Sequence, residues 1–261
     1  MRPETRPGAP PSSPGVRRAA RPAALAAAVL ALALLAVYPE PPSAGAPSSD
    51  STLPAILDTG DIAASVKVPE VRQWKGREVY QLVARAESNA FFSRFYKVRE
   101  RIESYWDRHG LYSRRYFEDR REGKYRQKSD IVFDPDRNEA VYSDGRTFPV
   151  PPRVQDALSA FYYTRTQALP VGGSIVFHYH ASRKSQPLQV KVLGREHVET
   201  PAGEFDCVVV EPILKAGGIF KNSGRLLIWL TDDQRRMPVL MKSKVAIGSI
   251  SVILQDVKPG A

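Results

Sequence analysis

Two histidines, His178 and His180, stand two residues apart in a stretch with the pattern of a β-strand, and such a pair could hold a metal ion. The two-residue period of a strand places both imidazoles on one face, about 6.5–7 Å apart. Zinc or copper would need a third ligand. The nearest candidates, Glu196 and His197, would have to lie on the opposite strand. We therefore expect a solvated or hydrogen-bonded histidine pair and no metal centre.

Two glutamates, Glu100 and Glu103, are the next candidates for acid/base chemistry. The alternation of this stretch puts them on opposite faces of one strand, so they do not form a ready pair, which would need hydrogen-bond reach. Glu100 falls on the apolar face, where burial would raise the pKa of its carboxyl. We expect it to pair with an arginine of the next strand. A hydrolase that uses Glu100, Glu103, His178 or His180 remains the alternative.

Nucleophilic chemistry has little support in the sequence. Cys207 is the single cysteine, which rules out a disulfide within the chain and a cysteine-rich zinc site. It lies in an apolar strand, where a lone cysteine behaves as a small buried hydrophobic residue. No Gly-x-Ser-x-Gly elbow occurs, and Gly248-Ser249 lacks the flanking pattern. We therefore favour a protein that is not an enzyme, with no catalytic residues and no cofactor.

The densest basic region lies between Arg114 and Lys128, where basic and aromatic residues are interleaved along a predicted hairpin. Such a surface can bind single-stranded nucleic acid, but the predicted export of the chain, described below, argues against that partner. Anionic lipid headgroups or polysaccharide are the anions that an exported protein meets. The simpler interpretation is a solvated sheet face with cross-strand ion pairs. The acidic partners would then be Glu118, Asp119, Glu122 and Asp130.

The elements that must position these residues are mostly strands, because the recurring pattern is alternation rather than a 3.6-residue period. Glu122-Gly123 marks a hairpin turn, and Phe95 to Trp106 alternates between an apolar and a charged face. One helix is predicted from Asp156 to about Gln167. Its aromatic face follows the helical spacing of Leu158, Phe161, Tyr162 and Arg165. About ten strands with short connections favour an antiparallel sheet that curls or closes to protect its edges.

The first fifth of the 261-residue chain differs in composition from the rest. Residues 1–43 carry five arginines and two acids, so the net charge of +10 falls to +7 without them. A basic segment ending at Arg21 precedes an apolar run from Ala23 to Val37, which has the size of a signal segment and is short for a membrane span. We predict three parts: a signal peptide or N-terminal membrane anchor at 1–46, a Pro/Ser-rich linker at 47–58 and a β-rich domain at 59–258.

The predicted location follows from this segment. A cleaved signal would release the domain into the periplasm, whereas an uncleaved one would anchor it to the inner membrane through residues 23–37, with the domain facing the periplasm. Small residues at Ala44-Gly45-Ala46 suit cleavage, and Pro47 directly after them does not. Both outcomes place the working domain in the cell envelope.

Five sequence blocks, taken in order, resemble one family of exported bacterial proteins. They are Phe91–Ser104, Glu122–Tyr125, Val150–Tyr163, Glu199–Cys207 and Ile228–Asp233. Together they are similar to the domain of unknown function 3108 family over about residues 76 to 256. The resemblance implies an envelope protein that is mainly β, with a curved antiparallel sheet or partly open β-barrel and one packed helix. It also implies a distant likeness to lipoprotein-carrier folds, and no established activity.

The chain departs from this family at its start, where members open with a hydrophobic strand. Here the corresponding stretch, Leu53 to Val66, is short and contains aspartate. From this departure we expect that the opening strand is missing or shortened. Without a full opening strand, the sheet is not expected to close completely.

The expected function is non-enzymatic binding of a lipid-like or other apolar ligand, or of an envelope protein. A structural or assembly factor is a further alternative beside the hydrolase. Aromatic residues could line an apolar cavity, although plain core packing between helix and sheet would bury them as well. The candidate ligand-binding residues are Phe91, Phe92, Tyr96, Arg99, Glu103, Tyr125, Phe161, Tyr162 and Trp229.

Overall fold

The computed structural model describes residues 55–58, 62–88, 90, 92–94, 97–214, 225–244 and 249–257. The first eight strands are β1 (Ala55–Asp58), β2 (Ile62–Trp74), β3 (Arg77–Ser88), β4 (Val98–Asp107), β5 (Ser113–Glu122), β6 (Tyr125–Asp134), β7 (Glu139–Tyr142) and β8 (Thr147–Pro149), with the 3-10 turn η1 (Phe92–Arg94) before β4. The helix α2 (Ala157–Arg165) leads to β9 (Ser174–Ala181), β10 (Lys184–Thr200), β11 (Gly203–Leu214), β12 (Leu226–Thr231), β13 (Pro238–Lys244) and β14 (Ser249–Val257).

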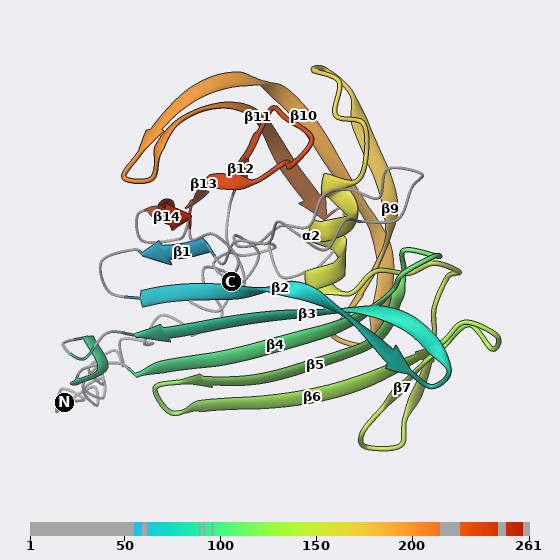
Figure 1. Cartoon of the computed structure of the whole chain (residues 1–261). Coiled ribbons are helices and arrows are strands. Elements are labelled where there is room, and N and C mark those ends of the chain that lie inside the picture. Colours follow the sequence, from blue (N-terminus) through green and yellow to red (C-terminus); the bar gives the residue numbers. More distant parts are fainter. Residues whose placement is uncertain are drawn as a thin grey trace, which may run out of the picture.

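All of these strands belong to one antiparallel sheet, in the order β8-β7-β6-β5-β4-β3-β2-β1-β14-β13-β12-β11-β10-β9. The sheet is open, with β8 and β9 as its two edges, and Figure 1 shows it curling so that the long β10–β11 hairpin arches over the broad layer of β2 to β6. The predicted fold class is thereby confirmed. The predicted export segment at 1–46 lies outside the described residues, and none of the described helices is long and apolar enough to cross a membrane.

The opening strand is present, so the expectation that it is missing is wrong, whereas its length of four residues and the open sheet fit the shortened strand that was the alternative. β1 pairs with both β2 and β14, so it joins the N-terminal and C-terminal halves of the sheet. β1 begins at Ala55, inside the range predicted as linker. The local sequence pattern for strands is weak here, but both β1 and β2 are hydrogen-bonded to a neighbouring strand on each side. Such tertiary pairing overrides the intrinsic strand propensity of the residues.

The two faces of the sheet follow the alternation predicted from the sequence. On β4, Val98, Ile102 and Trp106 are buried, whereas Arg99 and Arg101 are exposed. The helix α2 contacts β4 and β9 on the buried side, which makes the inner face of the curl the core and the outer face the solvated surface (Figure 1).

A buried polar anchor fixes α2 inside the curl. Asp156 caps the helix, as predicted, and its carboxylate accepts hydrogen bonds from the backbone N–H groups of Leu158 and Ser159. The hydroxyl of Ser104 on β4 donates to the same carboxylate at 2.6 Å. Beside it, the Trp106 indole donates to the side-chain oxygen of Gln155 at 3.1 Å. Because these groups are all buried, the cap ties the start of the helix to one position on β4.

Candidate functional site

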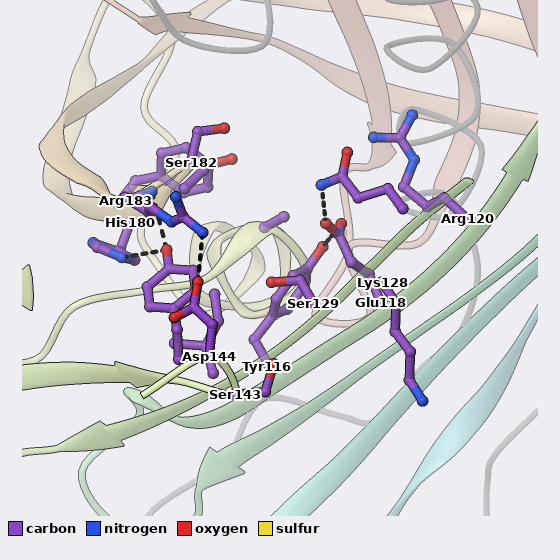
Figure 2. A pocket seen from close by; sticks show the side chains of 16 residues that line it. Tyr116, Glu118, Arg120, Lys128, Ser129, Ser143, Asp144, His180, Ser182 and Arg183 are labelled. Atoms are coloured by element: carbon purple, nitrogen blue, oxygen red, sulfur yellow. Dashed lines mark hydrogen bonds and ion pairs between the residues drawn. The ribbon is translucent and has the colours of Figure 1, made fainter. Parts of the chain in front are cut away.

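Side chains join the two edge regions of the sheet. The hydroxyl of Tyr142, at the end of β7, lies 2.9 Å from Nε2 of His180 on β9 and accepts a 3.0 Å hydrogen bond from the backbone N–H of Arg183. The Arg183 guanidinium donates to the carboxylate of Asp144 at 2.8 Å. We call this contact the seam and define it by Tyr142, Asp144, His180 and Arg183 (Figure 2).

His180 is held at the seam between two hydroxyls. Its Nδ1 lies 2.8 Å from the Ser185 hydroxyl, and its Nε2 faces Tyr142. In the neutral ring one nitrogen donates to its hydroxyl partner and the other accepts, so both nitrogens are satisfied by the protein. Burial lowers the pKa of His180 from 6.5 to about 4, so the ring is neutral at pH 7.

A cavity of about 540 Å³ lies between the seam and the inner face of β5 and β6. This volume is within the range of roughly 300–1,000 Å³ that is common for small-molecule sites. Its polar lining consists of three tyrosines (Tyr116, Tyr142, Tyr179), three serines (Ser129, Ser143, Ser182), two carboxylates (Glu118, Asp144) and Arg120, Gln127, Lys128, His180 and Arg183, and the rest is Ile131, Ala157 and Ala181. We call it the seam cavity; Figure 2 shows its two walls facing each other.

Glu118 is the central acceptor of the wall opposite the seam. Its two carboxylate oxygens accept hydrogen bonds from the Tyr116 hydroxyl at 2.9 Å and from the Gln127 amide at 2.6 Å. These neutral donors fix the orientation of the carboxylate and leave its charge uncompensated by a contacting cation among the described residues. Desolvation raises the pKa of Tyr116 well above 10, so this phenol stays a neutral donor.

Tyr179 lines the same cavity and is only 4% exposed. Burial raises the pKa of its phenol, and the charges of Glu118 and Asp156 raise it further. Its hydroxyl has no hydrogen-bond partner within the described part of the chain. The hydroxyl is not among the fully buried atoms that lack a partner, and Tyr179 lines the cavity, so this group is positioned to hydrogen-bond a molecule there.

The turn that carries Arg183 is strained. Ser182 and Arg183 have φ of 49° and 66°, a left-handed conformation that non-glycine residues seldom adopt. Two such residues in succession form the tight turn between β9 and β10, with the twist that a two-residue hairpin needs. The turn aims the Arg183 N–H at Tyr142 and its guanidinium at Asp144. Strain of this kind gathers at functional sites, where the surrounding contacts hold it in place.

Among the described residues, none of the candidates for ligand binding lines the seam cavity. Phe161 and Tyr162 are buried on α2, where the Arg165 guanidinium lies 5.7 and 5.1 Å from the centres of their rings. Trp229 is buried on β12 and donates its indole N–H to Glu196 at 2.8 Å. Their proposed role in ligand binding stays a prediction.

The remaining candidates are also spread over the sheet. Arg99 is exposed on β4, and Glu103 is half-buried on the same strand. Tyr125 is exposed at the start of β6. Phe91 and Tyr96 lie outside the described residues, as does the side chain of Phe92.

Three chemical predictions have clear outcomes. Glu100 is buried and forms the expected ion pair with an arginine of the next strand, Arg120, at 3.4 Å. Cys207 is fully buried, and burial raises the pKa of its thiol to about 12. His180 is buried and hydrogen-bonded, whereas His178 is exposed. The described residues contain no group of three side chains that could hold a metal ion.

Sequence reasoning missed the residues that build the cavity. Glu118, Asp144 and Arg183 come from three separate hairpins, and only the curl of the sheet brings them together. The one usable signal was the stretch that contains Tyr179 between its two histidines. The prediction made for this stretch, a solvated or hydrogen-bonded histidine pair, concerned the imidazoles and not the phenol.

Comparison with known proteins adds the family and the fold. Residues 51–255 match the family described as "Protein of unknown function (DUF3108)", which confirms the resemblance found in the five blocks. The sequence matches no curated protein. A β-barrel-like protein of domain of unknown function DUF1849 from Brucella abortus has a similar structure, with a TM-score of 0.52 and 11% identity over 81% of this chain and 97% of that one.

Two further solved structures are less similar. A DUF1089 family protein from Pseudomonas aeruginosa has a TM-score of 0.41 and 12% identity, over 69% of this chain and 88% of its own. A candidate lipoprotein from Parabacteroides distasonis has a TM-score of 0.34 and 12% identity, over 81% and 96%. The likeness to the DUF1849 protein supports the β-barrel-like fold and nothing about activity.

Proposed function

This chain belongs to the DUF3108 family of proteins of unknown function, and from the site itself we propose its role: it is a non-enzymatic binding protein of the cell envelope that holds a neutral, hydroxyl-rich ligand, such as a sugar ring, in the seam cavity. The observation that carries the proposal is a lining of six hydroxyl-bearing side chains around two carboxylates. The predicted export segment at 1–46 supports the location in the envelope.

The charges of the lining favour a neutral ligand. Arg183 is paired with Asp144, and Arg120 is paired with the buried Glu100. Lys128 points away from the cavity (Figure 2). Glu118 therefore remains as a charge that faces the ligand, and a carboxylate is a strong acceptor for hydroxyl groups but repels anions.

The remaining polar groups suit a ligand that both donates and accepts hydrogen bonds. A sugar hydroxyl can donate to Glu118 or Asp144 and accept from the Tyr179 phenol. The rings of the three lining tyrosines offer apolar surface to the C–H faces of such a ligand. The lining thus favours a polar ligand over the apolar one expected from the sequence.

Binding is favoured over hydrolysis by the state of the titratable groups. Of the four residues considered for a hydrolase, only His180 lines the cavity. Both of its ring nitrogens are engaged by hydroxyls of the protein, and a pKa of about 4 makes it a weak base at neutral pH.

Ligand-observed NMR tests the proposal. Saturation-transfer spectra of the full chain are recorded with glucose, N-acetylglucosamine and, as an anionic counterpart, glucuronate. Signals are expected from the neutral sugars and not from glucuronate. The substitution Ser143→Trp fills the cavity from its exposed edge and is expected to abolish them, whereas Ser174→Trp changes an exposed serine outside the lining and leaves them intact. Equal signals from both variants would show that the sugars bind elsewhere.

A further inference from the structure

The outer face of β3 to β6 carries two adjacent rows of charged side chains, on the side of the sheet away from the buried core. Strand pairing places one residue of each strand in each row. The first row is Glu87, Arg99, Arg121 and Arg126, and the second is Arg85, Arg101, Asp119 and Lys128. These rows hold six cations and two anions, a net charge of +4, and we call the six cations the basic face.

Several cations of the basic face stand directly opposite each other. Arg85 is paired with Arg101 across β3 and β4, and Arg99 with Arg121 across β4 and β5. Arg121 also stands opposite Arg126 on β6. Like charges at directly opposed positions destabilise a sheet. The fold therefore gains nothing from this arrangement, and a binding role accounts for it.

The acids of the outer face neutralise only part of this charge. Arg99 is paired with Glu87 at 3.3 Å, Arg121 with Asp119 at 2.9 Å and Arg101 with Glu103, so three of the six cations have an acidic partner. Within the described part of the chain, Arg85, Arg126 and Lys128 have no ion pair. A shallow groove of about 280 Å³ runs between the two rows, lined by Arg85, Glu87, Arg99, Glu100, Arg101, Asp119 and Arg121.

We propose that the basic face docks the protein on an anionic phospholipid bilayer, with headgroup phosphates in the groove between its arginines. The side chains of Arg99, Arg101 and Arg121 are all about half exposed and extend from one side of the neighbouring strands β4 and β5, and the other cations of the basic face come from β3 and β6. Four strands spaced about 4.8 Å apart present a broad array of cations rather than a cleft for one ion. Such an array matches the spread-out charge of a lipid surface.

Two further observations favour a bilayer over a soluble polyanion. The next rows on the same face contribute Phe117 and Tyr105, aromatic residues of the kind that sit at the headgroup level of a membrane, beside Glu103, Asp130 and Arg115. The sequence before β1 contains the apolar run from Ala23 to Val37, which is predicted to bring the chain to a membrane during export. With the outer face on the bilayer, the seam cavity lies on the other side of the sheet.

Vesicle co-sedimentation of the full chain tests this proposal. Binding is compared between phosphatidylcholine vesicles and vesicles in which a quarter of the lipid is phosphatidylglycerol. The double substitution Arg85→Gln and Arg126→Gln removes two exposed cations of the basic face. Each cation near an anionic surface changes the partition coefficient about fivefold, so the pair is expected to lower binding to the anionic vesicles roughly 25-fold. Binding to phosphatidylcholine, which reports the apolar N-terminal run, is expected to stay unchanged.

The matched control is Lys184→Gln with Lys191→Gln, which removes the same net charge from exposed positions on β10. This control is expected to bind anionic vesicles within about twofold of the wild type, and 0.5 M NaCl is expected to remove the contribution of the basic face. Equal losses in both variants would show a net-charge effect and overturn the proposal. A second result would also overturn the proposal: the wild type binds both kinds of vesicle equally, and the basic-face variant loses binding to alginate. The occupant of the basic face would then be an acidic polysaccharide.

Discussion

Replacement of His180 by glutamine is expected to make the stability of the protein less sensitive to acid. His180 is 2% exposed, and burial lowers its pKa from 6.5 to about 4. The unfolded chain therefore takes up a proton at a higher pH than the folded chain does. The stability that depends on the neutral ring is fully present above pH 6.5, is lost as the pH falls from 6.5 to about 4, and changes no further below that.

The magnitude follows from the same two pKa values. Each unit of difference corresponds to about 1.4 kcal/mol, and between pH 8 and pH 5 the loss amounts to about 2 kcal/mol. The groups that face the ring are the hydroxyls of Tyr142 and Ser185 and the edge contact with Phe133, none of which titrates in this interval. The interval also stays above the range in which most carboxylates titrate.

Urea unfolding followed by tryptophan fluorescence at pH 8 and pH 5 measures the effect. The wild type is expected to lose about 2 kcal/mol more over this interval than His180→Gln. His178→Gln, an exposed position on the same strand, serves as the control and is expected to behave as the wild type does. If the wild type and His180→Gln lost stability equally, His180 would not be buried as a neutral ring at the seam, and the reasoning would be wrong.

Three further substitutions test other parts of the fold by the same unfolding assay. Arg114→Met is expected to stabilise the protein by about 1 kcal/mol, because Nε and Nη1 of Arg114 are buried without a hydrogen-bond partner among the described residues; a clear destabilisation would contradict this. Arg120→Met leaves the buried carboxylate of Glu100 without its arginine and is expected to cost about 3 kcal/mol; a cost below about 1 kcal/mol, as for a surface pair, would refute a buried role. Asp156→Ala removes the acceptor that caps α2 and is expected to cost about 2 kcal/mol; an unchanged midpoint would argue against the anchor.

Much of the fold could be predicted because local patterns and tertiary contacts agree. The β5–β6 hairpin turns at Gly123, within the predicted Glu122-Gly123 turn, and φ of 53° at this glycine suits the tight connection. Asp156 caps the helix at the predicted start because a carboxylate there satisfies backbone N–H groups that have no partner inside the helix. The buried pair of Glu100 with Arg120 followed from a charge placed on the apolar face of a strand.

The opening strands could not be predicted for a physical reason. Pro54, Asp58 and Asp61 interrupt their stretch, and β1 is only four residues long. β1 is a strand because it pairs with β2 on one side and with β14 on the other. β14 lies about two hundred residues away in the sequence, so local composition does not reveal this pairing. A rule based on local composition reports such a stretch as linker.

The cavity was out of reach for a related reason. Tyr142 and His180 meet at 2.9 Å only because the sheet curls until its edge regions approach each other. No spacing in the sequence encodes that curl. The aromatic residues Phe161 and Tyr162, which the helical spacing does predict, lie on α2 and pack within the core.

The central claim is that the seam cavity is a site for a polar ligand. Its most direct test is the affinity of the full chain for the neutral sugar that gives the strongest saturation-transfer signal. This affinity is measured by NMR titration of the wild type, Tyr179→Phe and Tyr163→Phe. Tyr179→Phe removes only the hydroxyl that faces the cavity, and Tyr163→Phe makes the same change on α2 outside the lining. Loss of one hydrogen bond of about 1 kcal/mol is expected to weaken binding about fivefold in Tyr179→Phe and to leave Tyr163→Phe unchanged. Identical affinities for all three proteins, or no measurable sugar binding by the wild type, would contradict the account.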